Sequence, residues 1–324
     1  MPKSMPETPQ QPTNIIHMIN VEDKGFDTLA SYAPKAAMAV LNGVRDSRGK
    51  MALALDERLS RRWLKNSLYQ HEVENIHSLL NQPGLWDLNF SRHWCCTTAV
   101  DNNMTLYRTL DWPIDGMGEN TVVAKKEGYA GNYYNITWPG FVGVATAIAP
   151  LRFAAALNQA PALHRWWLGK VWRLLRYTFN KGQPPMHLLR KVFEEAANFD
   201  EALDMLQSMP VKVPVIFTLV GMKPGEAAVI ERVPAKAHIQ RGEPLAAANH
   251  WQGPWKGVPR GETSYQRQQT LQKNMGQKNL GWAKAPVHND GTRQVCELNV
   301  KQGFLKVKGV EANDKETDIL DLTF

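Results

Sequence analysis

The sequence predicts an α+β protein, and three observations lead to this class. Before Cys96 most of the chain favours helices, because apolar residues recur there at helical spacing. From Cys96 onward come short apolar or alternating runs separated by Asn, Gly and Pro, which is typical of antiparallel strands. A length of 324 residues with 43% hydrophobic residues indicates one large domain or two small ones, able to bury a core without metal or disulfides.

The first predicted elements are a strand and two helices. NIIHMINVED alternates between apolar and polar residues as a strand does. The stretch from Phe26 to Arg45 has the Ala-rich apolar spacing of a helix. Arg58 to Leu80 predicts a second, longer helix that ends near Pro83 and Gly84.

Strands dominate the rest of the chain, with two helical interruptions. The first strands are predicted in CTTAV, MTLYRTLDW, TVVAKKEG, YYNITWPGFVGVATAI and RFAAALNQ. Residues 161–183 predict an amphipathic basic helix, and residues 186–209 predict another helix in which Asp200 is the start signal for EALDMLQ. Strands return with VPVIFTLVG and EAAVIERV, joined by a turn at residues 223–225, and continue through AHIQRG and LAAANHW.

The formal net charge of +7 is concentrated in one stretch of the chain. Residues 128–193 contain eight Lys or Arg and no Asp or Glu, so the remainder is close to neutral. No helix-turn-helix, zinc-finger or ribonucleoprotein signature accompanies the basic stretch, and we therefore expect no nucleic-acid partner. A local basic patch fits a membrane surface or an anionic substrate better.

The chain has no sequence feature of a membrane-spanning or secreted protein. Its most apolar stretch, Phe141 to Leu157, is broken by Pro150 and Arg152 and falls short of the roughly 18 apolar residues that a membrane span needs. Residues 1–14 predict a disordered tail without the apolar middle of a secretory signal. We therefore expect a cytoplasmic protein, with peripheral contact at a membrane surface as an additional hypothesis.

Neither disulfides nor cofactors are expected. The three cysteines are too few for a disulfide scaffold and predict free thiols: Cys95, Cys96 and Cys296. The sequence contains no clustered His/Cys spacing and no glycine-rich phosphate loop, so we predict no metal and no organic cofactor.

Five ordered segments resemble the successive motifs of acid ceramidase and N-acylethanolamine acid amidase: CTTAVDNNMTLYRTLDWP, FAAALNQAP, GEAAVIERV, AANHW and SYQRQQTL. These amidases belong, with bile-salt hydrolases, penicillin V acylases and the penicillin acyltransferase, to the N-terminal-nucleophile hydrolases. INVED, MALALDERL and LWDLNFSRHW lie where the amidases carry the smaller subunit that is severed at maturation. The resemblance implies a four-layer αββα sandwich over residues 96–324, with residues 15–95 as a propeptide-like small-subunit segment.

The resemblance identifies Cys96 as the nucleophile, which becomes a new N-terminus when the Cys95–Cys96 bond is cut. A free α-amino group has a pKa near 8 and acts as general base toward the thiol of its own residue, so no catalytic His is required. Cys95 is the alternative nucleophile, but the family pattern places Thr directly after the nucleophile, and Thr97 follows Cys96. Taken alone, a cysteine beside Thr97 and Thr98 favours a buried, inert thiol over a nucleophile.

Arg108 and Asp111 lie three positions apart in YRTLDW, so on a regular strand their side chains point to opposite faces. The resemblance implies that Arg108 lies beside the sulfur, where a cation favours the thiolate, and that Asp111 binds the new amino group. The alternative for this pair is a surface ion pair of little energetic value.

Three further residues enter the site through the resemblance. Asn249 in AANHW matches the asparagine whose amide donates to the oxyanion of the tetrahedral intermediate. Asn158 in ALNQAP matches a second polar site residue, and Arg267 in SYQR matches an arginine that braces the site. The alternatives are a turn asparagine before Pro161 and a solvated surface arginine. His250 is not expected to be catalytic.

The basic insertion at residues 161–183 has two interpretations. Trp166, Trp167 and Trp172 combine aromatic bodies with neighbouring cations, as an interfacial helix does among lipid headgroups. Alternatively, the helix covers the sheet with one face and exposes the other to water.

The sequence therefore predicts a self-processing cysteine amidase that hydrolyses a linear C–N bond in a small N-acyl amide, with a fatty or otherwise apolar acyl group. One alternative is an acyltransferase in which an amine accepts the acyl group. A second alternative is a non-catalytic lipid-binding protein with the same fold.

Overall fold

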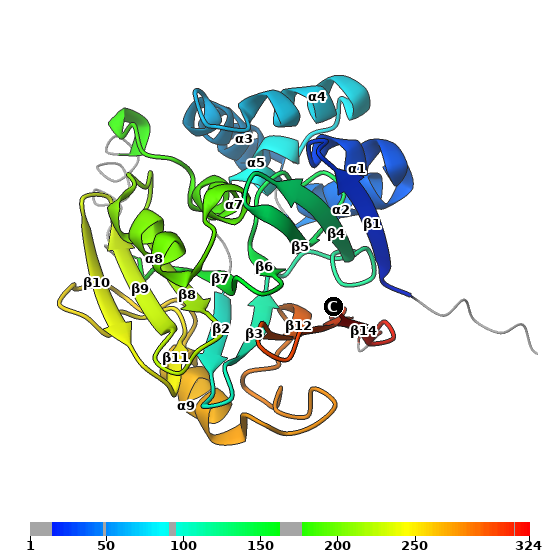
Figure 1. Cartoon of the computed structure of the whole chain (residues 1–324). Coiled ribbons are helices and arrows are strands. Elements are labelled where there is room, and N and C mark those ends of the chain that lie inside the picture. The colour runs from blue at the N-terminus through cyan, green and yellow to red at the C-terminus, as the bar shows by residue number, and fades with distance from the viewer. Residues whose placement is uncertain (1–14, 48–49, 91–94, 163–176, 314) are drawn as a thin grey trace, which may run out of the picture.

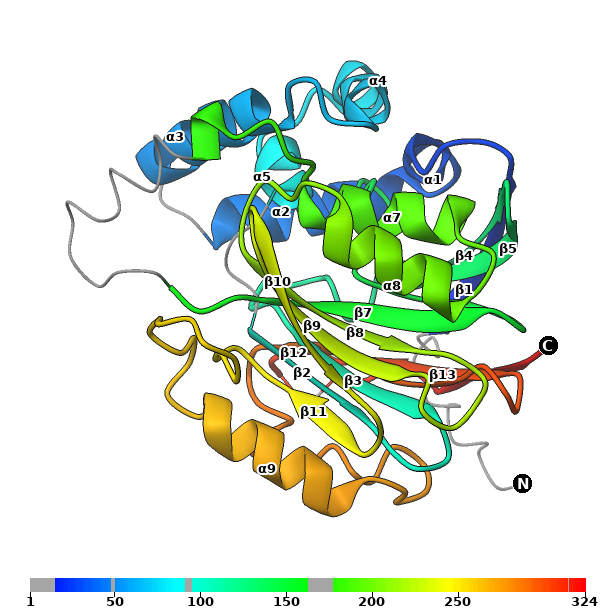
Figure 2. The same cartoon turned by 60° about the vertical axis from the view of Figure 1, so that its left-hand side comes forward.

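The computed structural model describes residues 15–47, 50–90, 95–162, 177–313 and 315–324. Two β-sheets lie face to face, with helices on both outer faces (Figure 1, Figure 2). Sheet A runs in the order β1 (His17–Glu22), β4 (Val122–Gly128), β5 (Gly131–Thr137), β6 (Thr146–Ala149), β7 (Phe153–Gln159), β8 (Val215–Val220), β9 (Ala227–Val233) and β10 (Lys236–Arg241). Sheet B runs in the order β11 (Leu245–Ala247), β2 (Cys95–Val100), β3 (Thr105–Asp111), β12 (Thr292–Asn299), β13 (Phe304–Gly309) and β14 (Leu320–Thr323).

The helices form the two outer layers and so complete the predicted αββα sandwich. Helices α7 (Pro185–Glu195) and α8 (Phe199–Ser208) cover sheet A, and α9 (Ser264–Asn274) covers sheet B (Figure 2). The segment before β2 contributes α1 (Asp27–Tyr32), α2 (Pro34–Asp46), α3 (Lys50–Leu64), α4 (Gln70–Leu80) and α5 (Leu85–Asn89). These helices gather at one end of the molecule beside β1 and β4 (Figure 1). One apolar cluster fills the space between the sheets, and others lie beneath the helices.

Three of the four helices that the sequence predicts are each divided in two, and most of the fourth, at residues 161–183, lies outside the described residues. Proline disfavours the helical conformation of the residue before it, and Ala33 before Pro34 accordingly has a non-helical φ of −131°, which separates α1 from α2. Helix α3 begins before the predicted start at residue 58, and a loop in which Asn66 has φ +63° separates it from α4. The prediction of single helices over these stretches was wrong.

The predicted helix at residues 186–209 is divided into α7 and α8, and the cap of α8 lies two residues before the predicted start signal. Helix α7 ends at Glu195, and Asn198 caps α8 by accepting a hydrogen bond of 3.0 Å from the backbone N–H of Glu201. Asp200, which the sequence suggested as the start signal, lies instead in the first turn, where its negative charge favours the helix dipole.

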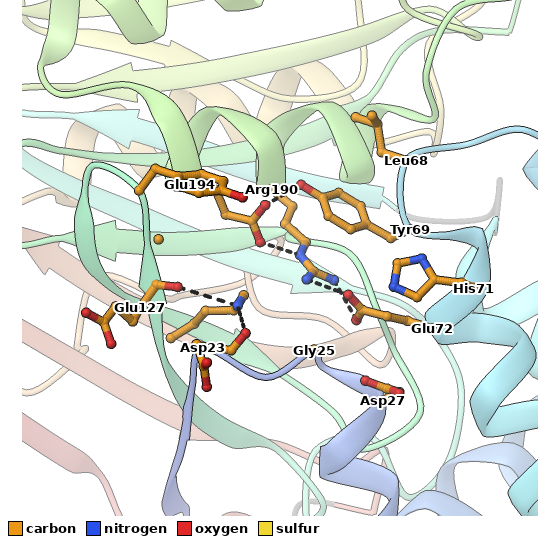
Figure 3. A pocket seen from close by; sticks show the side chains of 13 residues that line it. Asp23, Gly25, Asp27, Leu68, Tyr69, His71, Glu72, Glu127, Arg190 and Glu194 are labelled. Carbon is orange, nitrogen blue, oxygen red and sulfur yellow. Dashed lines mark hydrogen bonds and ion pairs between the residues drawn. The ribbon is translucent and has the colours of Figure 1, made fainter.

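The N-terminal segment, residues 15–90, packs directly against the rest of the fold. Its strand β1 extends sheet A by pairing with β4 in parallel. Glu72 forms a bidentate ion pair with Arg190 of α7, with both N···O distances 2.7 Å, and also accepts the backbone N–H of Phe26 (Figure 3). The Arg190 guanidinium lies over the ring of Tyr69 and donates to Glu194 at 2.9 Å. These groups line a pocket of about 590 Å³ at the boundary between the two parts.

Next to this boundary, His187 makes the stability of the fold depend on pH. The imidazole is fully buried in α7 against the ring of Tyr69, and neither ring nitrogen has a hydrogen-bond partner within the described part of the chain. Burial, with a smaller contribution from Arg190, lowers the pKa of His187 to about 3, against about 6.5 in an unfolded chain. The neutral ring therefore contributes stability above pH 6.5 that is lost as the pH falls toward 3.

The free energy of unfolding falls in both proteins when the pH is lowered from 7 to 4. We expect this fall to be about 3 kcal/mol smaller in His187→Leu than in the wild type. Urea denaturation at the two pH values measures the difference. Carboxylates contribute equally to both proteins, so they cancel in the comparison. Equal losses in the two proteins would show that His187 is protonated in the folded state.

Candidate active site

The register of β2 against β3 places the two neighbouring cysteines on opposite faces of sheet B. Cys96 lies opposite Leu110, and Cys95 lies opposite Asp111. Directly paired residues share a face, and successive residues alternate. The Cys96 side chain therefore faces the layer between the sheets, where Thr98 meets Thr218 of β8 at 2.7 Å, and the Cys95 side chain faces α9.

Arg108 of β3 is on the same face of sheet B as Cys96 and is fully buried. Its Nε donates to Thr146 at 3.2 Å, and its Nη1 donates to the side-chain oxygen of Asn158. Its Nη2 has no hydrogen-bond partner among the described residues. Burial raises the pKa of the Cys96 thiol to about 11, and the Arg108 cation opposes this rise. Cys96 is therefore a protonated thiol at neutral pH in the uncut chain.

Asp111 lies on the opposite face from Arg108, as the spacing of the two residues predicts. Its carboxylate accepts hydrogen bonds from Thr292 at 2.9 Å and Asn289 at 3.0 Å. Arg267 of α9 approaches the same carboxylate at 3.5 Å. Burial raises the pKa of Asp111, and the Arg267 guanidinium opposes the rise. Asp111 and Arg267 thus form a buried ion pair beneath Cys95.

Asn249 connects this ion pair to the backbone of Cys96. Its side-chain oxygen accepts the Cys96 N–H at 2.8 Å and an Arg267 N–H at 2.9 Å. Since both neighbours donate, the amide orientation is fixed, and the Asn249 Nδ2 donates to the carbonyl of Gln159 at 2.9 Å. Before cleavage, Asn249 therefore holds the backbone nitrogen that the cut would convert into an amine.

The structure brings all six predicted catalytic residues into one buried network around β2: Cys96, Arg108, Asp111, Asn158, Asn249 and Arg267. Asn158 faces the layer between the sheets, where its Nδ2 donates to the Ala247 carbonyl and to Thr98, both at 3.2 Å. Arg108, Asp111 and Arg267 are all buried, which excludes the alternatives of a surface ion pair and a solvated arginine.

Sequence reasoning missed three polar residues that support this network. Thr98 follows Cys96 by two positions, so strand alternation alone could have placed it on the same face. Ser264 accepts the Asn249 N–H at 3.0 Å, and its hydroxyl lies 2.9 Å from His250 Nδ1. Thr218 comes from β8, more than 100 residues further along the chain, and carries no local signal.

Comparison with known proteins agrees with this architecture. The family model described as acyl-coenzyme A:6-aminopenicillanic acid acyl-transferase matches residues 174–300. A solved structure of a Caenorhabditis elegans N-acylethanolamine-hydrolyzing acid amidase ortholog superposes with a TM-score of 0.51 at 17% identity, covering 64% of this chain and 93% of that one. The chain has the fold of the N-terminal-nucleophile hydrolases and is similar to them in sequence over part of its length.

The curated proteins to which the chain is similar match it over only part of their length. Acid ceramidase of Mus musculus is 32% identical over 95 residues, which is 29% of this chain and 23% of that protein. N-acylethanolamine-hydrolyzing acid amidase of Cavia porcellus is 25% identical over 200 residues, which is 58% of this chain and 53% of that protein. The chain thus spans between about a quarter and about half of the curated relatives that it matches.

Some of the predictions concern residues outside the part of the chain that the structure describes. Trp166, Trp167 and Trp172 fall in residues 163–176, and the predicted tail is residues 1–14.

All three cysteines are free thiols. In the described ranges, no helix has the length and apolarity needed to cross a membrane. In the same ranges, no three His, Cys, Asp or Glu side chains are grouped so that they could hold a metal ion.

Proposed function

We propose that this protein is a self-processing cysteine amidase that hydrolyses a linear C–N bond of a small N-acyl amide. The observation that carries the proposal is the contact between the Cys96 backbone N–H and the Asn249 side-chain oxygen at 2.8 Å, with the buried Arg108 guanidinium on the face of the sheet that bears the Cys96 side chain. One residue thus has its nitrogen held by a neutral acceptor and its sulfur beside a cation.

Maturation begins with the thiol of Cys96. The sulfur attacks the carbonyl carbon of Cys95, the C–N bond breaks, and the amine of Cys96 takes the thiol proton while a thioester forms. Water then hydrolyses the thioester, which leaves a carboxylate on Cys95 and restores the thiol. The Arg108 cation stabilises negative charge on sulfur, which the raised pKa of the Cys96 thiol otherwise disfavours.

Turnover uses the amine that maturation releases. With a pKa near 8, this amine removes the proton from the Cys96 thiol, a step that no other base in the site has to perform. The thiolate attacks the acyl carbon, and the leaving amine takes the proton when the C–N bond breaks. Water hydrolyses the acyl-enzyme to a carboxylic acid. The Asn249 amide stabilises the oxyanion in both tetrahedral intermediates once its Nδ2 exchanges the Gln159 carbonyl for the oxyanion.

The residues around Cys96 favour a substrate with an apolar acyl group. Cys96 belongs to a buried cluster that includes Leu110, Trp112, Trp138 and Phe141. Such a cluster suits an alkyl or aromatic acyl chain better than a charged one. The curated relatives are named for ceramide and N-acylethanolamine, which are both fatty-acid amides.

An acyltransferase is the second candidate, because the matching family model is described as an acyl-transferase. The two activities share the acyl-enzyme and differ in whether water or an amine attacks it. A panel of N-acyl ethanolamines, N-acyl sphingosines and N-acyl amino acids, assayed with and without an added amine, separates them. Free acid in the presence of the amine supports the hydrolase, and transfer of the acyl group to the amine supports the transferase.

Asn249→Ala is expected to lower kcat by about 10²- to 10³-fold with little change in KM, because an oxyanion donor acts in the transition state. Asn299→Ala is the matched control, since Asn299 is an equally buried asparagine, hydrogen-bonded to Asn103 and Thr105 at the far end of β12. Steady-state kinetics on both variants measure the effect. A comparable loss of kcat in both variants would remove Asn249 from the chemistry.

A further inference from the structure

A row of residues across sheet A places two buried polar side chains on the face toward sheet B. Asn158 of β7 pairs with Ile216 of β8, which in turn pairs with Glu231 of β9. Paired residues share a face, so Glu231 faces the layer between the sheets, as Asn158 does. Glu231 is fully buried, and a buried carboxylate requires hydrogen-bond donors.

The donors for Glu231 are two successive backbone N–H groups in the loop that follows β11. The N–H of Gln252 donates to Oε1 at 2.6 Å, and the N–H of Gly253 donates to Oε2 at 2.8 Å. The loop passes so close that a Cβ on Gly253 would lie 2.6 Å from Oε2 and 2.3 Å from His238 of β10. Only glycine leaves room for the carboxylate at this point.

The same loop carries Asn249 and is held by sheet A on both sides of it. Strand β11 pairs with β2 over only three residues and ends at Ala247. Asn158 donates to the carbonyls of Ala247 and Ala248 at 3.2 and 3.4 Å, just before Asn249. Glu231 holds residues 252 and 253, just after it.

We propose that Glu231 is a positioning residue of the active site, which fixes the Asn249 loop so that the Asn249 amide keeps its alignment on Cys96. The proposal rests on the function proposed above and adds a residue that does not touch the substrate. A displacement of about 1 Å in a group that acts on the transition state lowers the rate by up to about 10²-fold. The effect of Glu231 must therefore pass through Asn249.

Glu231→Gln is the informative variant, because its amide accepts one backbone N–H and presents a donor to the other. We expect kcat per folded enzyme to fall by about 10- to 100-fold while KM changes less than about twofold. Glu226→Gln is the matched control. Glu226 also accepts two successive backbone N–H groups, of Met222 and Lys223, but in the β8–β9 turn, about 16 Å away along the strand. Its kcat should stay at the wild-type value.

A double-mutant cycle separates positioning from general destabilisation. If Glu231 acts through Asn249, Glu231→Gln changes kcat by less than about twofold in the Asn249→Ala background. Multiplicative effects of the two changes would overturn the proposal. So would a fall in kcat of the same size in Glu226→Gln.

Amide hydrogen exchange over residues 249–253, measured on the Cys96→Ala protein with and without Glu231→Gln, reports on the clamp without requiring turnover. Faster exchange in the Gln variant is expected, because one of the two N–H groups loses its acceptor. Unchanged exchange would overturn the clamp itself. If exchange is faster in the Gln variant but the wild type hydrolyses no N-acyl amide, the amidase function and the positioning role of Glu231 are refuted, whereas its contact with the loop is confirmed.

Discussion

The purified protein is expected to separate into two fragments that meet at the Cys95–Cys96 bond, whereas Cys96→Ala stays a single chain of 36.6 kDa without amidase activity. The reason is that one sulfur performs both reactions: it attacks the Cys95 carbonyl in maturation and the acyl carbon in turnover. Intact mass spectrometry, before and after incubation between about pH 4.5 and 8, measures the cut, and a fatty-acid amide assay measures turnover.

Cys95→Ala is the control, because Cys95 faces α9 and not the layer between the sheets. This variant should still be cut and should still turn over. Cleavage that persists in Cys96→Ala, or that disappears only in Cys95→Ala, would transfer the role of nucleophile to Cys95. A wild-type chain that remains whole at every pH would contradict self-processing.

Glu72→Ala is expected to destabilise the folded protein by about 3–5 kcal/mol, because it leaves the Arg190 guanidinium buried and without its bidentate partner. Both side chains are at most 5% exposed, so solvent screens the pair weakly. Denaturation with guanidinium chloride measures the lost free energy of unfolding, and it is performed on the Cys96→Ala protein because this protein stays one chain. In the cut protein, the same change should also weaken retention of the N-terminal fragment, which gel filtration measures.

Glu316→Ala is the matched control on the surface. Its ion pair with Lys308 has a 42% exposed carboxylate, and the loss should stay below about 1 kcal/mol. Replacing Glu72 and Arg190 together by Met removes both charges and should restore most of the stability lost in Glu72→Ala. A double variant as unstable as the single one would show that the ion pair itself, and not the unpaired charge, determines the cost.

Local patterns in the sequence were sufficient for much of the fold. Alternating or short apolar runs predicted strands up to residue 251, and the spacing of Arg108 and Asp111 predicted that they face opposite ways, because strand geometry depends on immediate neighbours. The last three strands, β12, β13 and β14, were not predicted. Helix ends were less predictable. Pro34 is visible in the sequence as a boundary, but the start of α8 depended on which of two polar residues, Asn198 or Asp200, made the capping hydrogen bond.

The site was predictable where motifs carried it and not where its contacts are long-range. The six candidate site residues came from the resemblance to a family, and the contact between Cys96 and Asn249 spans 153 positions that no periodicity connects. Glu231 lies within a quoted motif, yet its partners are backbone N–H groups more than 20 positions away. Every residue type except proline supplies a backbone N–H, so no side chain in that loop indicates the bond.

Strand β1 and Glu72 lie on the N-terminal side of the proposed cut, whereas their partners, β4 and Arg190, lie on the other side. The uncut chain therefore folds as one molecule, with an equilibrium independent of protein concentration. Once the bond is cut, the same native contacts join two molecules, and refolding becomes a bimolecular association. The midpoint of its denaturation curve therefore shifts when the protein is diluted. Cleavage thus changes the order of the folding reaction without requiring any change in the folded structure.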